Sequence, residues 1–564
     1  MKTKWRLITV FAKNNSKLFL ATFLSGLFYN VLTLLIPISI GRFYEFNFGF
    51  SSHRLQIIKS VPFINTDDFT TFLIFFFCIV GIRFVFEYIN KYLIALICEK
   101  FAKDLREKLF AHQLQIATEV YVQKGIGKYL LRYSGDLKSI QNYISQGLLR
   151  FLQDIFLITI LLITIAYINI QLGLILSGSI VLFSLILFFI NKFLYSISVK
   201  RRNKRSGMLT FINTRLRGIH TIKAFNKYSP EEKRYRKRSE ELLEIGKQYQ
   251  KVASLIQSVI PALTYLMLGT LMWYVYYIKS FNDKTVDQSV LLILILLIIS
   301  FLPILRRVLR VSIVWKLGNI SFEKLINIFS LKAENTLVFQ DMNLANKKLV
   351  FKEISFRYPN SEQEVFKNTS LTIEPKKTTA IIGNSGAGKS AFVSLLLKMY
   401  LPGEGSVNYG SYSNDQLSEK TIRKNIAVVS KDFPLYGKDV YEAIVYSRKN
   451  HKKQKVAALL KDLQQFEHPK DVLMLNDRIG DLGNILTSSQ QKILIYCRAL
   501  LTNKPILLID EPFTDLNFET VDYLKSLLSG LKSKKTLIIL DTSLPEGLGL
   551  DHYYEINERK FIKS

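Results

Sequence analysis

The feature that most restricts the fold is a series of long apolar segments in the first half of the chain. A membrane-spanning helix needs about 20 mostly apolar residues, and a backbone in lipid must satisfy its own hydrogen bonds. These segments therefore predict an all-α membrane domain over residues 1–330. We expect its six spans at about 17–42, 70–97, 149–169, 171–194, 253–278 and 288–311.

The positively charged residues indicate how these helices cross the membrane. A formal net charge of +31 suits either nucleic acid or an anionic membrane as a partner. Lys and Arg are concentrated before the first span and in the loops 99–148 and 195–252. Because cytoplasmic loops collect Lys and Arg, both termini and these two loops are predicted to be cytoplasmic. The charges follow the loops rather than one patch, so we expect a lipid bilayer and no nucleic acid as a partner.

The N-terminus gives an expectation for localisation. Its basic residues run into an apolar segment that is too long for a signal peptide, and no small-residue cleavage site follows. We therefore interpret this segment as a retained first span. No organellar transit segment precedes it, so we expect a multi-pass protein of a bacterial inner membrane.

Several ionisable residues lie in or near the predicted spans. Arg83 and Glu87 are four residues apart, so they share a helix face and can pair. Asp154, Arg307 and Arg310 are further examples, as is Arg306. An ionisable group inside a membrane is a candidate functional site. The alternative is an ion pair within the bundle or a residue at the membrane boundary, and the sequence leaves both open.

The second half of the chain contains a glycine-rich phosphate-binding motif. A strand-like run, 379–382, leads into the pattern G-x-x-x-x-G-K-S, and a helix-like run, 391–399, follows. Glycines let backbone amides approach phosphate, and the helix N-terminus favours an anion. The pattern predicts an α/β P-loop NTPase domain over 331–564 that binds ATP. The binding residues are Gly383, Asn384, Ser385, Gly386, Ala387, Gly388, Lys389 and Ser390.

Within this motif, Lys389 is predicted to contact the β- and γ-phosphates and Ser390 to ligate Mg²⁺. About 120 residues later, four apolar residues at 506–509 run into Asp510 and Glu511. This pattern predicts a buried strand that ends in two carboxylates. We expect Asp510 to hold Mg²⁺. Glu511 and Lys389 are the predicted catalytic residues, and Glu511 is expected to polarise the attacking water.

With these motifs, the sequence resembles the ATP-binding-cassette (ABC) exporters over essentially its whole length. The phrases at 105–110 and 217–225 resemble the two cytoplasmic loops of that family. The resemblance implies a domain-swapped dimer of two half-transporters with twelve helices in all. It also implies short coupling helices near 114–122 and 214–224 that dock on the nucleotide-binding domains, one of them on the partner's.

The resemblance also implies further nucleotide contacts. Tyr358 matches the aromatic residue that stacks on adenine, although a core tyrosine is the alternative. The run Leu486, Thr487, Ser488, Ser489 and Gln490 stands where the family has its Leu-Ser-Gly-Gly-Gln signature. That signature faces the γ-phosphate of the nucleotide bound to the other subunit.

The sequence departs from the family at several motif positions. Serines replace both signature glycines, and a Cβ there should crowd the phosphate. Lys431 stands in place of the glutamine that senses Mg²⁺, and a charged lysine cannot ligate a metal. Thr542 replaces the switch histidine, and Asn517 stands where the family often has aspartate. The sequence thus predicts ATP binding with hydrolysis that is impaired or that depends on a partner subunit.

These observations support an ATP-driven half-transporter that exports a hydrophobic or amphipathic substrate. A heterodimer is favoured over a homodimer, because a partner could supply an intact signature. The alternative is an ATP-binding membrane regulator with little hydrolysis, and a soluble nucleic-acid ATPase is disfavoured by the six spans. Lipids, peptides and hydrophobic drugs all remain open as substrates.

Overall fold

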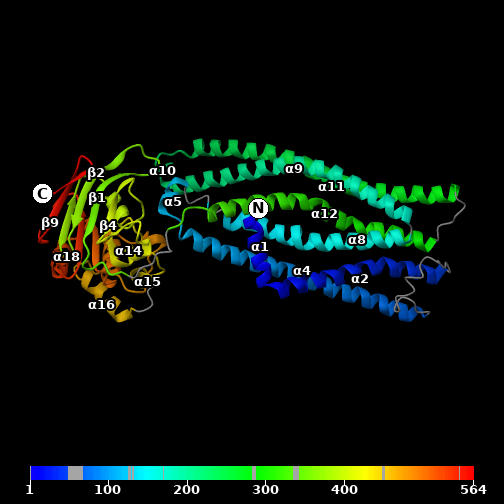
Figure 1. Cartoon of the computed structure of the whole chain (residues 1–564), viewed down its shortest axis with the longest axis horizontal. Coiled ribbons are helices and arrows are strands. Elements are labelled where there is room, and N and C mark those ends of the chain that lie inside the picture. The colour runs from blue at the N-terminus through cyan, green and yellow to red at the C-terminus, as the bar shows by residue number, and fades with distance from the viewer. Residues whose placement is uncertain are drawn as a thin grey trace. The chain divides into compact units, whose positions relative to one another are not determined.

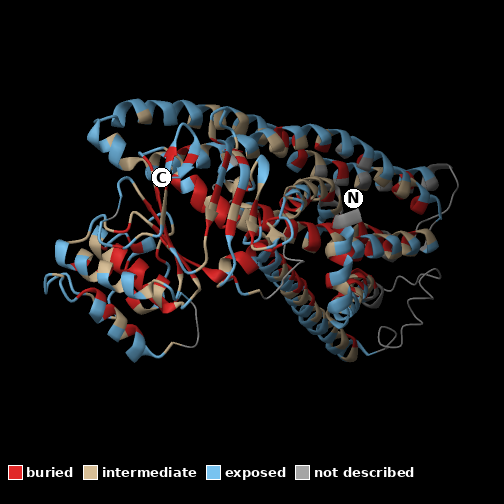
Figure 2. Cartoon of the chain, turned by 60° about the vertical axis from the view of Figure 1, so that its left-hand side comes forward, coloured by how far each residue is buried: buried red, intermediate tan, exposed pale blue. Residues whose placement is uncertain are grey.

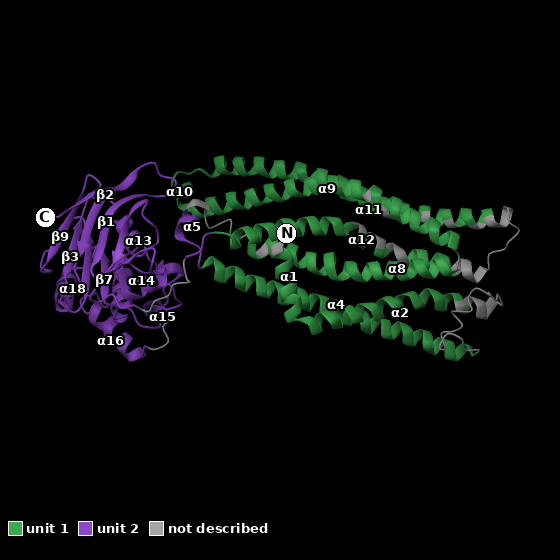
Figure 3. Ribbon diagram, in the orientation of Figure 1, with its two compact units in different colours: residues 1–114, 126–331 green, residues 115–125, 332–564 purple. Residues whose placement is uncertain are grey.

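The computed structural model describes residues 2–48, 68–124, 129, 132–168, 170–281, 288–334, 342–446, 451–544 and 546–563. The chain forms two compact units (Figure 3). Unit 1 comprises Met1–Leu114 and Ile126–Leu331, and unit 2 comprises Gln115–Gly125 and Lys332–Ser564.

Unit 1 is built from helices, several of which are far longer than a membrane is thick (Figure 1). No cluster of turn-forming residues interrupts these segments, so the helices continue without a break. Three of them continue even through a proline, at Pro37, Pro261 and Pro303. The helices are α1 (Lys2–Asn14), α2 (Ser16–Phe48), α4 (Phe69–Gln113), η2 (Arg132–Asp136), α7 (Leu137–Asn142), η3 (Tyr143–Arg150), α8 (Phe151–Ile168), α9 (Ile170–Arg217), α10 (Ile219–Ala224), α11 (Tyr228–Phe281) and α12 (Gln288–Phe329).

Five helical stretches among the described residues are long and apolar enough to cross a membrane. They are Ser16–Gly41, Phe69–Gln113, Leu137–Tyr167, Ile170–Arg217 and Tyr228–Tyr274. The first five predicted spans fall on these stretches. The sixth, 288–311, lies on α12, and the side chains at several of its positions lie outside the described residues.

Many large apolar side chains on the long helices of unit 1 are exposed, while others form its core, and Figure 2 colours these helices by burial. The core includes Leu157, Leu161 and Leu297, which are almost fully buried. Large apolar side chains such as Phe84 and Phe189 are about two-thirds exposed. A helix that is apolar on all sides belongs in a hydrocarbon environment, which supplies the contacts that water cannot.

Unit 2 contains a four-stranded antiparallel sheet and a six-stranded, mostly parallel sheet. The first has the order β2-β1-β4-β5, and the second has the order β10-β9-β3-β8-β7-β6. The strands are β1 (Leu349–Arg357), β2 (Glu364–Ile373), β3 (Thr378–Ile382), β4 (Glu404–Tyr409), β5 (Tyr412–Ser413), β6 (Ile426–Val429), β7 (Ile506–Asp510), β8 (Thr536–Asp541), β9 (His552–Asn557) and β10 (Lys560–Lys563).

The parallel strands β3, β8, β7 and β6 place the predicted motifs at one edge of their sheet. Each is a short, almost fully buried run of mainly apolar residues, as expected for strands covered on both faces. β8 pairs with β3 on one side and β7 on the other. The loops that follow β3 and β7 therefore leave the sheet at the same edge, where ligands bind in parallel sheets. The helices of this unit are α5 (Thr118–Lys124), α13 (Lys389–Leu396), α14 (Glu419–Asn425), α15 (Val440–Val445), α16 (Lys453–Leu463), α17 (Ser488–Leu501) and α18 (Phe518–Leu531).

The segment 115–125, which the predicted division at residue 330 assigned to the membrane half, belongs to unit 2. Ile116 forms a β-bridge with Ala333. The amide of Ala117 donates to the carbonyl of Lys332 at 3.0 Å, and an ion pair of 3.1 Å joins Lys332 to Glu119. Backbone pairing therefore attaches this segment, and α5 with it, to the start of the nucleotide-binding unit.

Candidate nucleotide-binding site

The predicted phosphate loop lies between β3 and α13 and has the backbone that such a loop requires. Gly386 and Gly388 have φ values of +84° and +117°, which L-residues rarely adopt. A Cβ on Gly388 would lie only 2.8 Å from Cγ1 of Val365. Asn384, Ser385 and Gly386 are exposed. The loop therefore presents its backbone to a ligand in a conformation that its glycines make accessible.

Lys389 is the first residue of α13, and its side chain is buried against the loop. Its ammonium donates to the carbonyl oxygens of Gly383, at 2.5 Å, and Asn384, at 3.2 Å. The amide of Gly383 in turn donates to Asp541 O at the end of β8. A phosphate bound in the loop would offer this cation stronger, charged acceptors than the two carbonyls.

Asp510 ends β7 as a half-buried carboxylate whose environment favours a cation. Ser430 Oγ donates to Asp510 Oδ2 at 3.1 Å. Burial raises the pKa of Asp510, and the nearby carboxylates of Glu511 and Asp432 raise it further. A divalent cation would offset this electrostatic cost, and oxygen ligands such as Asp510 and the exposed hydroxyl of Ser390 suit Mg²⁺.

Within the described residues, no three His, Cys, Asp or Glu side chains form a metal-binding cluster. A site for Mg²⁺ at Asp510 would therefore be of the kind in which phosphate oxygens and waters complete the coordination. The residues present fit that requirement, because Asp510 and Ser390 supply two oxygen ligands beside the phosphate loop.

Glu511 follows Asp510 in a left-handed backbone conformation with φ of +51°. Its amide donates to Leu540 O at 2.8 Å, and its carbonyl accepts from Thr514 Oγ1 at 3.1 Å. Lys492, on α17, also donates to this carbonyl and to Asp510 O. Burial lowers the pKa of Lys492 to about 8. Lys492 is not among the residues predicted from the sequence, where it stands as a single cation among the apolar positions of that helix.

Tyr358 is half-buried, and its ring packs against two aromatic neighbours. Ring centroids lie 5.1 Å from Phe356 and 5.4 Å from Tyr400, both in edge-on geometry. Burial raises the pKa of its hydroxyl. Tyr358 is therefore partly a core residue, which was the alternative to adenine stacking. The part of its ring that stays exposed leaves a surface on which a base could stack.

The signature-like run caps α17. Thr487 and Gln490 form a reciprocal capping box, with hydrogen bonds of 3.2 and 2.9 Å. Ser488 is exposed. Ser489 Oγ donates to Glu467 at 3.1 Å, and the same carboxylate accepts from Asn517 at 3.1 Å. Ser489 and Asn517, two of the departures from the family pattern, are therefore joined through Glu467, a residue that was not predicted from the sequence.

The other two departures also have contacts within their own unit. Lys431 forms an ion pair with Asp515, in the loop that follows Glu511. Thr542 is exposed, and its amide and hydroxyl lie 2.7 and 3.4 Å from the carboxylate of Asp541. The side chain at 542 is thus turned toward its neighbour and offers no imidazole to a phosphate.

Four of the ionisable residues predicted in or near the spans, Arg83, Glu87, Asp154 and Arg307, are paired inside unit 1, and the side chain of Arg306 lies outside the described residues. Arg83 lies 3.2 Å from Glu87 and donates to Tyr29 and Thr33. Asp154 is buried and accepts two hydrogen bonds from Arg307, at 2.6 and 3.0 Å. The structure shows ion pairing within the bundle, and both arginine side chains are partly exposed.

A buried network of amide side chains lies on the same helices and was not anticipated from the sequence. Gln153 exchanges two hydrogen bonds of 3.1 Å with Asn90, donates to Thr22 O, and accepts at its own carbonyl from Asn30. In the sequence, the only indication of this network is that each amide side chain stands alone in an apolar segment. Such bonds hold membrane helices together, because unpaired polar groups in hydrocarbon are costly.

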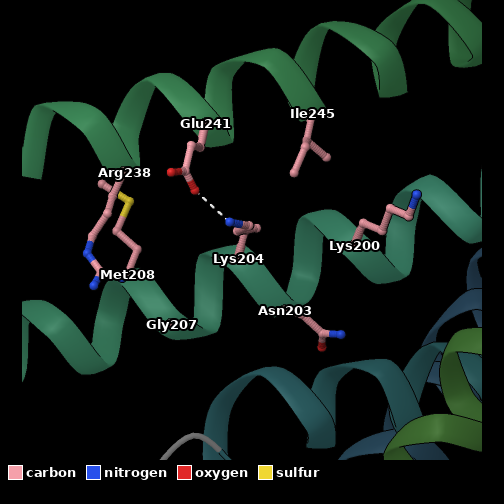
Figure 4. Close-up of a pocket in the computed structure, with 8 residues that line it drawn as sticks. All are labelled: Lys200, Asn203, Lys204, Gly207, Met208, Arg238, Glu241 and Ile245. Atoms are coloured by element: carbon pink, nitrogen blue, oxygen red, sulfur yellow. Dashed lines mark hydrogen bonds and ion pairs between the residues drawn. The ribbon is translucent and has the colours of Figure 1, made fainter.

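A cavity of about 380 Å³ lies between α9 and α11 (Figure 4). Lys200, Lys204 and Arg238 contribute three positive charges to its wall, and Glu241 contributes a carboxylate held 2.5 Å from Lys204. This excess of positive charge is in keeping with the predicted cytoplasmic position of residues 195–252.

Comparison with known families identifies the class. Residues 18–302 match the ABC transporter transmembrane region, and residues 366–514 match the family described as ABC transporter. The first match covers more than half of the chain, so the chain belongs to the ABC transporters. Within that family it is an ATP-driven half-transporter, an ATPase coupled to transport, with an all-α membrane domain followed by an α/β nucleotide-binding domain. The predicted fold class and function class are thus confirmed.

Similar proteins cover most of the chain at low identity. The ATP-dependent lipid A-core flippase of Pasteurella multocida (strain Pm70) is 22% identical over 487 residues, covering 85% of this chain and 82% of the relative. The protein of the same name in Salmonella typhimurium (strain LT2) is 24% identical over 464 residues, 81% of this chain and 79% of the relative. The structure of a bacterial Atm1-family ABC exporter with ATP bound has a TM-score of 0.84 at 17% identity, covering 97% and 94% of the two chains.

Proposed function

We propose that the chain is one half of a dimeric exporter that moves an amphipathic, lipid-like substrate across a bacterial inner membrane. The relatives are named as lipid A-core flippases. The observation that carries the proposal is the combination of apolar outer helix faces with partly exposed arginines inside the same bundle. An amphiphile needs both, since its chains prefer hydrocarbon and its polar group needs charged or hydrogen-bonding partners.

At the nucleotide, we assign the roles by the positions of the side chains. Lys389 and the loop from Gly383 to Gly388 bind the phosphates, and Tyr358 stacks on the base. Ser390 and Asp510 would hold Mg²⁺, which supplies neutralising charge to the phosphates. Glu511 orients and polarises the attacking water. The contacts of Lys389 with loop carbonyls and the hydrogen bond from Ser430 to Asp510 support this arrangement.

The dimer is proposed to be heteromeric. In the run Thr487 to Gln490, the hydroxyl of Ser489 is committed to Glu467, and two added Cβ atoms stand where close approach is needed. A partner with an intact signature would complete the site at Lys389 and Glu511. The site formed by this chain's own signature would be the weaker of the two.

Transport coupling is proposed to use α5 and α10, with both termini in the cytoplasm. α5 is attached to unit 2 of its own chain through Ile116 and Lys332. A groove of about 490 Å³ on unit 2 is lined in part by Phe433, Tyr436 and Tyr446, of which the two tyrosines are about half exposed. We assign it to the partner's α10, a helix of six residues with no buried side chain of its own.

A second candidate function is an ATP-binding membrane regulator with little hydrolysis. Two observations favour it: Thr542 offers no imidazole, and Lys431 is engaged with Asp515. The intact arrangement of the phosphate loop and the two carboxylates favours the transporter.

The experiment is ATP hydrolysis and lipid translocation by the purified chain in liposomes, alone and with candidate partner halves. Glu511→Gln is the blank, and Glu519→Gln, at an exposed position on α18, is the matched control. Activity only with a partner, lost in Glu511→Gln and kept in Glu519→Gln, supports the heterodimer. Full activity alone supports a homodimer, and ATP binding without turnover in any pairing supports the regulator.

A further inference from the structure

Lys492 is a fully buried cation, with 0% of its surface exposed. Burying an ammonium group is costly unless its protons meet acceptors, and an apolar residue at the same place would avoid that cost. The acceptors of Lys492 are two successive backbone carbonyls, those of Asp510, at 3.1 Å, and Glu511. A buried lysine in this setting indicates that the carbonyls of these two peptides need a hydrogen-bond donor, which an apolar side chain cannot supply.

The peptide of Glu511 is one that needs external support. Its φ of +51° is uncommon for a residue with a side chain, and such conformations persist where the surroundings hold them. Leu540 accepts from its amide, whereas Thr514 and Lys492 donate to its carbonyl. Lys492 is the donor that comes from a different secondary-structure element and carries a full charge.

A second contact from the same helix continues this support. Tyr496, one turn beyond Lys492 on α17, is also fully buried, and its hydroxyl donates to Pro512 O at 2.9 Å. Two side chains of α17 therefore bind three consecutive carbonyls, at Asp510, Glu511 and Pro512. The backbone that carries both carboxylates is thus fixed against one face of α17.

We propose that Lys492 is a positioning residue for ATP hydrolysis, which holds the Glu511 peptide so that its carboxylate faces the attacking water. The inference rests on the role proposed for Glu511. Lys492 acts through that residue, because its ammonium is occupied by backbone carbonyls and has no exposed surface. Its charge also attracts the carboxylates of Asp510 and Glu511, which offsets part of the repulsion between them.

The test compares Lys492→Met, which removes every donor, with Lys492→Gln, which keeps a neutral one. Lys461→Met, at an exposed position on α16, is the matched control. The full chain, together with the partner half where turnover requires one, is assayed in liposomes for kcat and KM, for ATP affinity without Mg²⁺, and for thermal unfolding. Since misplacement of a reacting group costs up to about 100-fold in rate, we expect kcat of Lys492→Met to fall by about 10- to 100-fold. ATP affinity and KM should stay within about threefold of wild type, because uniform binding is untouched, and Lys492→Gln should recover part of the rate.

Two results would overturn the inference while leaving the proposed function intact. One is a kcat for Lys492→Met within about twofold of wild type, less than the loss expected from misplacement. The other is a loss of ATP affinity in parallel with kcat, which would show a structural role. If Lys492→Met does not fold, Lys492→Gln decides: its shorter, neutral side chain cannot reproduce both bonds of the ammonium to the carbonyls of Asp510 and Glu511, so an unchanged kcat in that variant contradicts the proposal. Wild-type hydrolysis that survives Glu511→Gln would instead overturn the proposed function and this inference with it.

Discussion

The glycines of the phosphate loop allow a graded test of how the site is built. At Gly388, φ is +117°, and an added Cβ would lie 2.8 Å from Val365 Cγ1 and 3.1 Å from Phe366 Cζ. At Gly386, φ is +84°, but a Cβ would meet nothing within 4 Å. Gly530 in α18 has neither constraint. Alanine at Gly386 therefore tests backbone strain alone, alanine at Gly388 tests strain together with steric overlap, and alanine at Gly530 is the control with neither.

The expected magnitudes follow from these distances. A left-handed conformation costs an L-residue about 1–2 kcal/mol, and about 1.4 kcal/mol is tenfold in affinity. Gly386→Ala should therefore weaken ATP binding by about 5- to 30-fold. Gly388→Ala adds a contact with strand β2 that cannot relax freely, so we expect a loss of more than about 100-fold. Gly530→Ala should bind ATP normally and gain up to about 1 kcal/mol of stability.

The assay is equilibrium ATP binding to the purified full chain in lipid, with thermal unfolding recorded for each variant. Binding by Gly388→Ala as tight as by Gly530→Ala would refute the reasoning, because the loop would then bind phosphate without its observed backbone. Weaker binding by Gly386→Ala than by Gly388→Ala would refute the ranking of overlap above strain.

Three further outcomes are expected. Asp154→Ala leaves Arg307 unpaired in the bundle, and because that arginine is partly exposed we expect a stability loss of about 1–3 kcal/mol. Thermal unfolding in detergent should show the loss, and adding Arg307→Ala should reverse part of it; an unchanged single variant would contradict the pairing. Ser489→Gly removes one hydrogen bond to Glu467, worth about 1 kcal/mol, yet should raise ATP turnover in the dimer because the Cβ is gone. Lower turnover would show that the serine contributes to the site. Burial raises the pKa of the Cys497 thiol, so less thiolate forms near neutral pH and maleimide should label this cysteine only after unfolding; mass spectrometry of the folded chain checks this.

The local motifs could be predicted because short sequence patterns determine them. The spacing of Gly383, Gly388 and Lys389 requires a strand, a tight loop and a helix in succession, and the structure has β3, the loop and α13 in that order. The apolar run before Asp510 was predicted to be a buried strand, and it forms β7. The roles of these residues toward ATP and Mg²⁺ remain predictions, since their test is biochemical.

The contacts that join distant segments could not be predicted. Lys492 meets Glu511 across 19 residues, and Gln153 meets Asn90 across 63. Such pairs depend on which helix faces which strand or helix, and a single sequence carries no signal for that. The resemblance implied that a helix near 114–122 docks on a nucleotide-binding domain, but the β-bridge between Ile116 and Ala333, which joins residues 115–125 to unit 2, has no local pattern in the sequence.

That attachment also has a consequence for the order in which the chain is made. Residues 115–125 and the chain from Lys332 onward form one unit, although the whole stretch from Ile126 to Leu331 separates them. Domains fold as units during synthesis, from the N-terminus onward. The first segment therefore emerges from the ribosome long before its backbone partners at Lys332 and Ala333 exist. The nucleotide-binding unit can be completed only after the intervening helices have been synthesised, so the chain acquires its ATP-binding half after its membrane half.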